Sequence, residues 1–371
     1  MNKVNASIDI FSDISYSGYQ HVNQMLFEHI DANYKNLDVN FYHRFYMRMP
    51  SLLNLFFRVY KKPVSQGFSS CVNNYSNVIE VRNFPSEYGV LDSLNCALVK
   101  NQLQTKFDNL ITFVPSKSLS KVNDLYENVV YYCVHDSDNQ EYSERNKDYE
   151  KELVSKSNIV FCDNKEVLNR LSDFSTFIDV ANLNYDELVK CKQDGYKYYY
   201  VSPPTPDVFF NASCDSLKFF DLFYYGSIHK DIDQEVLKKL SLLGYEICIM
   251  SSSRLDFDSN NITYVNPSSN LDDVVDNMEK CRAVILPYTN SKFMETVSPA
   301  KINQSLASGF PVFCSNDSLI EKYELLDVSK LYDKKVPIDT FKMSLSYFST
   351  NNVQSSIASE LMDKITKLVI G

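Results

Sequence analysis

Several residue types and patterns are scarce or missing, and each absence narrows the class of protein. The chain has no Trp and only 8 Gly among 371 residues, so a Gly at a strand-to-helix turn carries more information than usual. It has no apolar run of about 18 residues, the length needed to cross a bilayer. The N-terminus, MNKVNASIDIFSD, has no apolar segment of signal-peptide length. We therefore expect a cytoplasmic protein that does not span a membrane.

The 9 cysteines form no CxxC pair, and no spacing of His and Cys suits a metal site. Several lie inside apolar runs, such as Cys133 in VVYYCV and Cys248 in YEICIM. We therefore expect buried free thiols in a reducing compartment, with neither a bound metal nor a cofactor.

The charge distribution argues against nucleic acid as the main partner, because the formal net charge is −10. One segment, residues 41–63, differs from the rest. FYHRFYMRMPSLLNLFFRVYKKP contains Arg and Lys interleaved with aromatic residues and no acid. Such a segment suits peripheral contact with an anionic membrane. A core strand and a helix with a solvated basic face explain it equally well, so both interpretations stay open.

Apolar runs rich in β-branched and aromatic residues alternate with amphipathic segments, which is typical of βαβ units around a parallel sheet. In the first half, the pattern predicts strands at 4–13, 37–45, 76–84, 108–116, 127–136 and 158–164, and helices at 19–30, 92–106, 142–157 and 165–172. In the second half, it predicts strands at 219–227, 245–253, 261–267, 282–288 and 311–316, and helices at 231–244, 271–281, 298–309, 318–327 and 353–370.

The proline-rich segment VSPPTPDVFFNAS, residues 201–213, contains no regular element in this prediction and separates the two halves. We therefore predict an α/β protein of two doubly wound, Rossmann-like domains that face a cleft. The domains are predicted at 1–205 and 206–350, with a C-terminal helix at 351–371 that packs back on the first domain. Ligands of open α/β sheets bind at the carboxyl ends of the strands.

The most informative motif is SPAKINQSLASGFPV, which begins at Ser298. Ser298 suits a helix N-cap, Pro299 the first helical position, and Gly309 the end of the helix. A helix N-terminus attracts phosphate, and Lys301 adds a full positive charge in the first turn. Gln304 lies on the same face, where its amide can bind a ribose or phosphate oxygen. An ordinary capped helix explains the caps, but not Lys301 together with the ASGFPV tail.

The pattern P-x-K-x-x-[EQ]-x-L-A-x-G-x-P-V resembles the donor-site helix of GT-B glycosyltransferases. The resemblance implies transfer of a sugar from a nucleotide sugar, with UDP the expected nucleotide, Lys301 on the diphosphate and Gln304 on the nucleotide. Most retaining members have Glu at position 304 and another Glu where this chain has Thr296, and these departures weaken assignment to that group. Lys followed by Gln at this spacing is similar to the inverting xanthan glucuronosyltransferase type, which acts on a lipid-linked acceptor.

Five further residues lie at or just after the ends of predicted strands of the second domain. Gly226 ends the strand in YYGSIHK, and the resemblance implies that it turns beside the donor phosphates, with Ser227 and Lys230 following. Tyr288 in ILPYTNS resembles a tyrosine near the diphosphate and sugar, and Asn266 in TYVNP follows the strand that contacts the base. Ordinary turn chemistry explains each of them separately. Their order and spacing within one domain favour the donor site.

Inversion requires a base that deprotonates the acceptor hydroxyl. YYCVHDSDNQ places His135, Asp136 and Asp138 at the carboxyl end of the most apolar strand of the first domain. The segment resembles the YxxxD[D] stretch of xanthan-type transferases, which implies Asp136 as the catalytic base, with Asp138 and His135 as supporters or rivals. A helix cap or an Asx turn at Asp136 is the alternative. GT-B enzymes generally need no metal, and the D-x-D of HDSD lies in the acceptor domain.

The loop FSDISYSGY follows the first strand and usually lines the acceptor side in GT-B enzymes. It contains Asp13, a second candidate base. Tyr16, Tyr19 and the nearby His21 are candidate acceptor-binding residues that stack on or hydrogen-bond a sugar. The same aromatic residues are equally compatible with core packing.

Three function classes remain open. The first is a transferase that extends a polysaccharide, lipopolysaccharide or lipid-linked oligosaccharide, held at the inner face of the membrane by residues 41–63. The second is a nucleotide-sugar epimerase on the same fold, which is expected to have more histidines in the cleft than the 5 of the whole chain provide. The third is a non-catalytic GT-B-like scaffold, which the missing Glu at position 296 keeps open.

Overall fold

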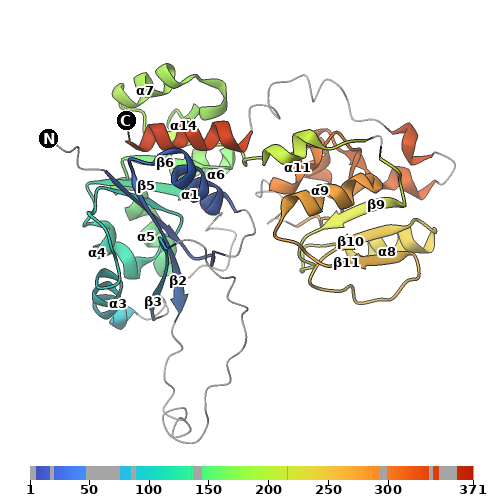
Figure 1. The fold of residues 1–371 in the computed structure, drawn as a ribbon, viewed down its shortest axis with the longest axis horizontal. Helices are drawn as coiled ribbons and strands as arrows, with labels where there is room; N and C mark the ends of the chain where they lie inside the picture. Colours follow the sequence, from blue (N-terminus) through green and yellow to red (C-terminus); the bar gives the residue numbers. More distant parts are fainter. Residues whose placement is uncertain are drawn as a thin grey trace, which may run out of the picture. The chain divides into compact units, whose positions relative to one another are not determined.

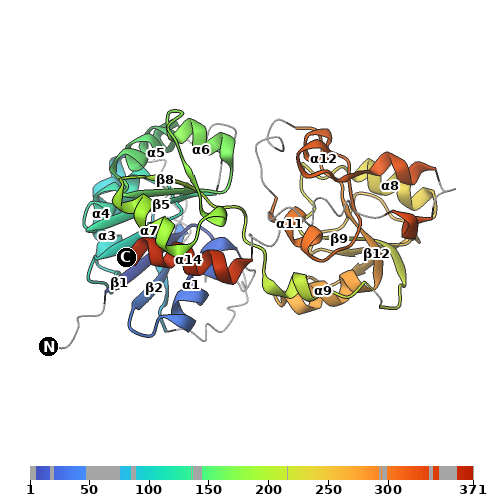
Figure 2. The same ribbon diagram turned by 90° about the horizontal axis from the view of Figure 1, so that it is seen from above.

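The computed structural model describes the chain except for residues 1–5, 17–20, 47–75, 85–88, 135, 137–143, 215, 292–293, 295–298, 334–336, 342–356 and 371. The described residues form two compact α/β units, each with its own parallel sheet (Figures 1 and 2). Unit 1 comprises Met1–Ile178, Asn184–Tyr200 and Met362–Gly371. Unit 2 comprises Asp179–Leu183 and Val201–Leu361.

The sheet of unit 1 has eight strands in the order β3-β2-β1-β4-β5-β6-β8-β7, and neighbouring strands from β3 to β8 pair in parallel. They are β1 (Ser7–Ser12), β2 (Asp38–Tyr46), β3 (Val78–Asn83), β4 (Asn109–Thr112), β5 (Asn128–Cys133), β6 (Ile159–Cys162), β7 (Ile178–Asp179) and β8 (Tyr198–Tyr200). β1 and β5 are buried along almost their whole length, as expected for strands with helices on both faces.

The α-helices of unit 1 are α1 (Val22–Asn33), α3 (Asp92–Lys100), α4 (Ser120–Asn123), α5 (Glu144–Lys156), α6 (Lys165–Leu171), α7 (Tyr185–Gln193) and most of α14 (Ala358–Ile370). Short 3₁₀ helices are η1 (Gly89–Leu91) and η2 (Lys117–Leu119), and η3 (Val180–Asn182) belongs to unit 2. Figure 2 shows α3, α4 and α5 on one side of the sheet and α1 and α14 on the other. The sequence interpretation placed no element between 173 and 200, where the chain forms β7, η3, α7 and β8.

Polar contacts fasten α14 to unit 1. Tyr34 Oη donates to Asp363 Oδ1 at 2.6 Å, Lys192 Nζ donates to the carbonyl of Leu368 at 2.6 Å, and Asn128 Nδ2 donates to the carbonyl of Val369 at 3.2 Å. The apolar face of the helix, including Leu361, Ile365 and Leu368, is buried.

The sheet of unit 2 has six strands in the order β11-β10-β9-β12-β13-β14, all paired in parallel. They are β9 (Phe220–Tyr225), β10 (Ile247–Met250), β11 (Ile262–Val265), β12 (Cys281–Leu286), β13 (Val312–Cys314) and β14 (Leu326–Asp327). The helices are α8 (Gln234–Leu242), α9 (Leu271–Glu279), α11 (Ala300–Ala307) and α12 (Asp317–Tyr323), with 3₁₀ helices η4 (Asp207–Asn211), η5 (Val328–Tyr332) and η6 (Ile338–Thr340).

Two local predictions for unit 2 were wrong. The proline-rich segment 201–213 contains a regular element, η4, because its three prolines all precede Asp207. The helix predicted at 318–327 ends at Tyr323, where Glu324 adopts a left-handed φ of 51°, and Leu326–Asp327 then pairs with β13. The apolar pair Leu325–Leu326 serves the sheet rather than a helix face.

Among the described cysteines, none forms a disulfide, and Cys133, Cys162, Cys248, Cys281 and Cys314 are buried, as the apolar runs predicted. None of the helices in the described part of the chain is long and apolar enough to span a bilayer. Of the basic segment 41–63, residues 41–46 belong to β2, and residues 47–63 lie outside the described residues.

Candidate functional site

The strand order of unit 2 creates a topological switch point between β9 and β12. β9 comes first in sequence, β10 and β11 lie on one side of it, and β12, β13 and β14 lie on the other. In such sheets the loops after the two central strands leave toward opposite faces and open a crevice at the carboxyl ends. Gly226 directly follows β9, and Pro287 and Tyr288 directly follow β12. The fold therefore places these loops where an open α/β sheet binds its ligand.

Gly226 is required at this turn because of its backbone conformation and because of the close approach of Lys301. Its φ is +121°, a conformation that residues with a side chain rarely adopt. Its N–H donates to the carbonyl of Met250 at 2.9 Å and so fixes the turn. A Cβ at this position would lie 2.6 Å from Lys301 Cε and closer still to Lys301 Nζ. The lysine side chain therefore rests directly on the glycine backbone, and only the absence of a Cβ allows the contact.

Lys301 lies in the first turn of α11 and is partly buried. Its Nζ is 5.9 Å from the centroid of the Tyr225 ring, the residue before Gly226. Removal from water lowers the pKa of the Lys301 ammonium to about 8. Among the residues that the structure describes, no carboxylate lies within 4.0 Å of Nζ. The site therefore has a cation without a described counter-ion.

Gln304 lies one turn further along α11, and its side chain is buried. Tyr225 Oη donates to Gln304 Oε1 at 2.9 Å, so the amide oxygen is engaged with the sheet. The Tyr225 ring stacks on Phe223 at 5.5 Å between ring centroids and on Phe209 at 6.5 Å. These contacts fix α11 against β9 and hold its N-terminal end beside the Gly226 turn.

The start of α11 differs from the predicted cap by one residue. The helix begins at Ala300 with Pro299 as the N-cap, whereas the sequence indicated Ser298 as the cap and Pro299 as the first helical residue. Ser298 lies outside the described residues. Pro299 has no side-chain acceptor for the first helical N–H groups. Gly309 follows the helix with a left-handed φ of 77°, as predicted.

The N-terminus of α8 provides a contrast within the same unit. Asp233 caps it, accepting from the N–H groups of Glu235 and Val236 at 3.1 and 3.3 Å. A cavity of about 410 Å³ lies here and is lined by Asp233, Glu235 and Asp256 as well as Lys238. The Asp233 carboxylate therefore accepts the hydrogen bonds of the first helical N–H groups, and the neighbouring carboxylates repel an anion. The N-terminus of α8 is thus a poor phosphate site, and that of α11 is a better one.

The other predicted donor residues are more scattered. Ser227 and Lys230 are exposed in the loop after Gly226, while Asn266 is exposed after β11, two strands away from β9. Tyr288 is 4% exposed and packs in the core of unit 2, with an antiparallel bridge from its backbone to Ile232. The structure thus brings Gly226, Lys301 and Gln304 together around Tyr225, a residue that sequence reasoning missed.

Sequence reasoning also missed a polar link between the two switch-point loops. Asp231, which is buried, accepts from Ser291 Oγ at 3.1 Å and lies 3.6 Å from His229 Nδ1. Its carbonyl accepts from the N–H of Thr289 at 3.0 Å. The H-x-D spacing in the sequence was the available signal. This link fixes the loop after β9 against the segment that leads from β12 to α11.

In unit 1, Asp136 follows β5 and is 8% exposed. Arg170 of α6 donates from Nη2 to Asp136 Oδ1 at 3.1 Å, and its Nη1 lies 4.0 Å from the buried Glu150. Glu150 in turn accepts from Tyr131 Oη at 2.6 Å. The predicted base is therefore a buried, ion-paired carboxylate at the carboxyl edge of the sheet. His135 and Asp138 lie outside the described residues.

The predicted acceptor residues follow β1, at the switch point between β1 and β4. Asp13 and His21 are exposed, and Tyr19 lies outside the described residues. Tyr16 donates to Glu28 Oε1 at 2.6 Å, and its ring contacts Phe27 and Phe41 edge-on at centroid distances of 5.9 and 5.6 Å. Tyr16 therefore serves as a packing residue between β2 and α1.

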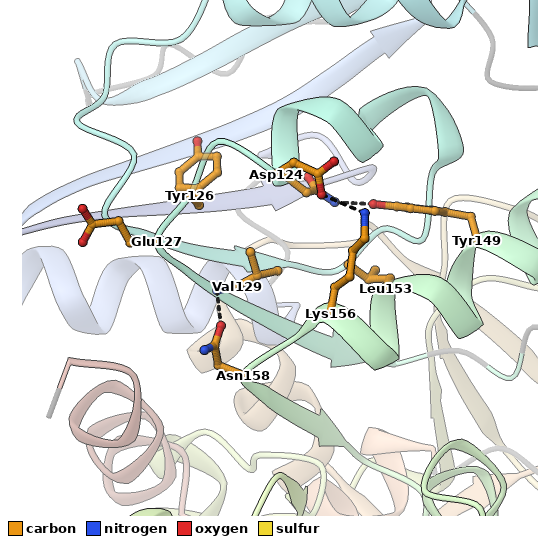
Figure 3. A pocket seen from close by; sticks show the side chains of 9 residues that line it. Asp124, Tyr126, Glu127, Val129, Tyr149, Leu153, Lys156 and Asn158 are labelled. Atoms are coloured by element: carbon orange, nitrogen blue, oxygen red, sulfur yellow. Dashed lines mark hydrogen bonds and ion pairs between the residues drawn. The ribbon is translucent and has the colours of Figure 1, made fainter.

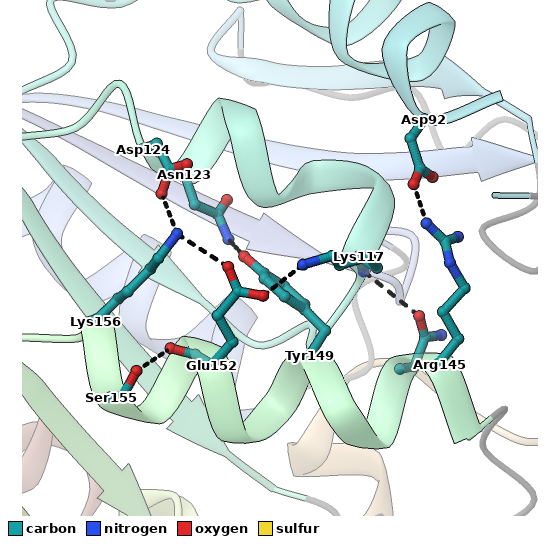
Figure 4. A network of polar contacts seen from close by, with 10 residues as sticks. Asp92, Lys117, Asn123, Asp124, Arg145, Tyr149, Glu152, Ser155 and Lys156 are labelled. Atoms are coloured by element: carbon teal, nitrogen blue, oxygen red, sulfur yellow. Dashed lines mark hydrogen bonds and ion pairs between the residues drawn. The ribbon is translucent and has the colours of Figure 1, made fainter. Parts of the chain in front are cut away.

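A second cavity of about 410 Å³ lies in unit 1 at the opposite edge of its sheet (Figure 3). Val129 at the start of β5 and Asn158 just before β6 line it, so it lies at the amino ends of the strands. Figure 4 shows the neighbouring ion pairs, in which Lys156 bridges Asp124 at 2.9 Å and Glu152 at 3.0 Å. The lysine that lines the cavity is thus paired with carboxylates, and Glu127 adds a further negative charge, which argues against an anion site here.

Within the described part of the chain, no group of three His, Cys, Asp or Glu side chains is placed to hold a metal ion. At the switch point of unit 2, Lys301 and the N–H groups that begin α11 are suited to hold an anion.

No family model and no curated protein matches this sequence. Solved structures match over nearly the whole chain. The trehalose-6-phosphate phosphatase N-terminal domain of Candida albicans has a TM-score of 0.56 at 7% identity, covering 98% of this chain and 97% of that one. The UDP-GlcNAc 2-epimerase of Neisseria meningitidis bound to UDP-GlcNAc has a TM-score of 0.52 at 10% identity, covering 98% and 99%. The UDP-N-acetylglucosamine 2-epimerase of Rickettsia bellii has a TM-score of 0.50 at 10% identity, covering 98% and 96%.

Likeness at such low identity shows the fold alone. Together with the two parallel sheets, it confirms the predicted class: the chain has a GT-B fold built from two Rossmann-like domains.

Proposed function

We propose that this chain is a glycosyltransferase that moves a sugar from a nucleotide sugar to a saccharide or lipid-linked saccharide acceptor. The observation that carries the proposal is the contact of Lys301 with Gly226 at the switch point of unit 2, beside the N-terminus of α11, whose N-cap residue Pro299 offers no side-chain acceptor. A nucleoside diphosphate supplies the negative charge that this cation lacks among its described neighbours. The first N–H groups of α11 supply further hydrogen bonds to phosphoryl oxygens.

The reaction places most of its developing charge on the leaving diphosphate. As the anomeric C–O bond to the diphosphate breaks, Lys301 and the α11 amides stabilise that charge without a metal. Ser227, Lys230 and Ser298 belong to the segments that flank the phosphates. Tyr225 holds Oε1 of the Gln304 amide, and Nε2 of the same amide is then available to contact the nucleotide.

The acceptor is proposed to bind unit 1, with Asp136 as the general base. Its carboxylate takes the proton of the acceptor hydroxyl while that oxygen bonds to the anomeric carbon, which inverts the configuration. Arg170 holds the charged carboxylate in one orientation through the 3.1 Å contact. His135 and Asp138 support or replace Asp136 in this proposal, and Asp13 is the rival base. Residues 41–63 are proposed to touch an anionic membrane when the acceptor is lipid-linked.

UDP is the first nucleotide to test, because the similar Neisseria structure is bound to UDP-GlcNAc. Thermal unfolding is measured with UDP, GDP, ADP, CMP and dTDP. A ligand at one hundred times its Kd stabilises the native state by about 2.7 kcal/mol. We expect one nucleotide to raise the Tm, and Lys301→Ala to remove the effect. Lys238→Ala, which removes a half-exposed lysine of α8, is the matched control and should keep the rise in Tm. No response to any nucleotide would refute the donor site.

A nucleotide-sugar epimerase is the second candidate, because two of the similar structures are UDP-N-acetylglucosamine 2-epimerases. Incubation with UDP-GlcNAc and no acceptor separates the two functions. Conversion of the donor sugar to its 2-epimer without an acceptor supports the epimerase. If the donor stays unchanged without an acceptor and is consumed only once an acceptor is added, the transferase is supported.

A further inference from the structure

The amine of Lys301 lies in surroundings that favour its neutral form. Gly226 closes one side with bare backbone, and the Tyr225 ring lies 5.9 Å away. An ammonium group in such a place loses hydration and gains no described carboxylate in return. The protonation state of the Lys301 amine therefore depends on the charge of whatever binds beside it.

The titratable groups on the elements around α11 do not replace the missing anion. Tyr225 of β9 is a buried phenol whose pKa is raised by burial, so it stays neutral. Cys314 of β13 is a buried thiol whose pKa is raised to about 11 by burial. Asp207 of η4 accepts from Ser359 Oγ at 3.0 Å. In the loop after β9, the carboxylate of Asp231 faces His229, 3.6 Å from Nδ1.

We infer that binding of a nucleoside diphosphate at this site is coupled to the uptake of a proton by Lys301, in the fraction of molecules whose amine is neutral beforehand. The coupling rests on the proposed function, because it requires the diphosphate to lie beside α11. The bound phosphoryl oxygens provide the counter-charge that stabilises the ammonium form. The same proton then stays on Lys301 while the diphosphate is bound and is released when it leaves.

The size of the coupling follows from the pKa of about 8 for Lys301 in the free protein. Below that pH the amine is already charged and little uptake occurs. At pH 8 binding should take up roughly half a proton per nucleotide, and at pH 8.5 roughly three quarters. Affinity should weaken about fourfold between pH 7 and pH 8.5, since the neutral fraction must first be protonated. The terminal phosphate of UDP is ionised in this range and contributes little uptake.

Isothermal titration of the full chain with UDP tests the coupling. Titrations at pH 7, 8 and 8.5 in Tris and in HEPES, whose ionisation heats differ, give the number of protons taken up. We expect the uptake to rise across this range in the wild type and in Lys238→Arg, a matched change at a half-exposed lysine. In Lys301→Arg the guanidinium is always charged, so uptake should vanish and affinity should no longer depend on pH.

A second measurement covers the case in which the larger side chain of Lys301→Arg prevents binding. Trace acetic anhydride labels neutral amines, and mass spectrometry follows labelling of Lys301 in the wild type from pH 6.5 to 10. The midpoint should lie about 8 without UDP and move up by one unit or more with UDP. UDP binding without proton uptake at pH 8 would overturn the coupling and leave the proposed function intact. If none of UDP, GDP, ADP, CMP and dTDP binds at pH 7, the proposed function fails, and the coupling fails with it.

Discussion

Replacing Gly226 by Ala perturbs the proposed donor site at its tightest contact. The new Cβ would overlap the end of the Lys301 side chain, since it would lie 2.6 Å from Cε and closer to Nζ. The lysine must therefore move away from the turn. In addition, a φ of +121° strains any residue with a side chain, at a cost of about 1–3 kcal/mol. We expect Gly226→Ala to lose nucleotide binding and to lower the Tm by about 2–4 °C for each kcal/mol.

The assay is thermal unfolding of wild type and variants with and without UDP, read together with direct titration of UDP. Gly195→Ala is the matched control, because Gly195 also has a positive φ of 86° but an added Cβ would meet nothing within 4 Å. It should lose stability through strain alone and keep the response to UDP. Because truncating Lys301 removes the clash, Gly226→Ala combined with Lys301→Ala should destabilise less than the sum of the single changes.

Wild-type affinity for UDP in Gly226→Ala would refute this reasoning, because the Lys301 position would then be irrelevant to binding. Strictly additive stability effects would show that the two residues do not touch in solution.

Three further perturbations test unit 1. Burial raises the pKa of Asp9 to about 6, so the native state binds its proton more tightly than the unfolded chain and stability is lost as pH rises from 4 to 6. Asp9→Asn should remove a loss of about 2 kcal/mol, measured as the difference in the free energy of urea unfolding between pH 4 and 6.5. Arg170→Met leaves buried Asp136 without its cation and should cost about 1–3 kcal/mol at pH 7, and an unchanged urea midpoint would contradict the ion pair. Tyr34→Phe removes the hydrogen bond to Asp363 and should cost about 1 kcal/mol; unaltered hydrogen exchange in α14 would argue against a role for that contact.

Much of the fold could be predicted locally. Strands such as β5 and β10 are continuous apolar runs because both faces of a parallel strand are covered, and that signal needs no tertiary information. Segment 173–200 escaped prediction because α7 is polar on most of its surface and depends on its capping box, in which Asn184 and Glu187 satisfy each other's backbone N–H groups. β14 escaped because two residues have no periodicity.

Some features of the candidate site could likewise be predicted from the local sequence, and others could not. The sequence by itself determined the α11 motif, with Lys301 in the first turn and Gly309 at its end, because caps and helix periodicity act within a few residues. It also determined that Gly226 follows a buried strand. Tertiary structure alone decided that these two residues touch and that Tyr225 holds Gln304 across 79 positions of chain.

Tertiary structure also decided that Arg170 pairs with Asp136, that the Tyr16 ring contacts Phe41, and that Tyr288 packs in the core of unit 2. Such contacts depend on strand order and on which faces of a helix and a sheet meet. The local sequence determines neither the strand order nor the pairing of faces, because an apolar side chain packs favourably against any apolar face of suitable shape.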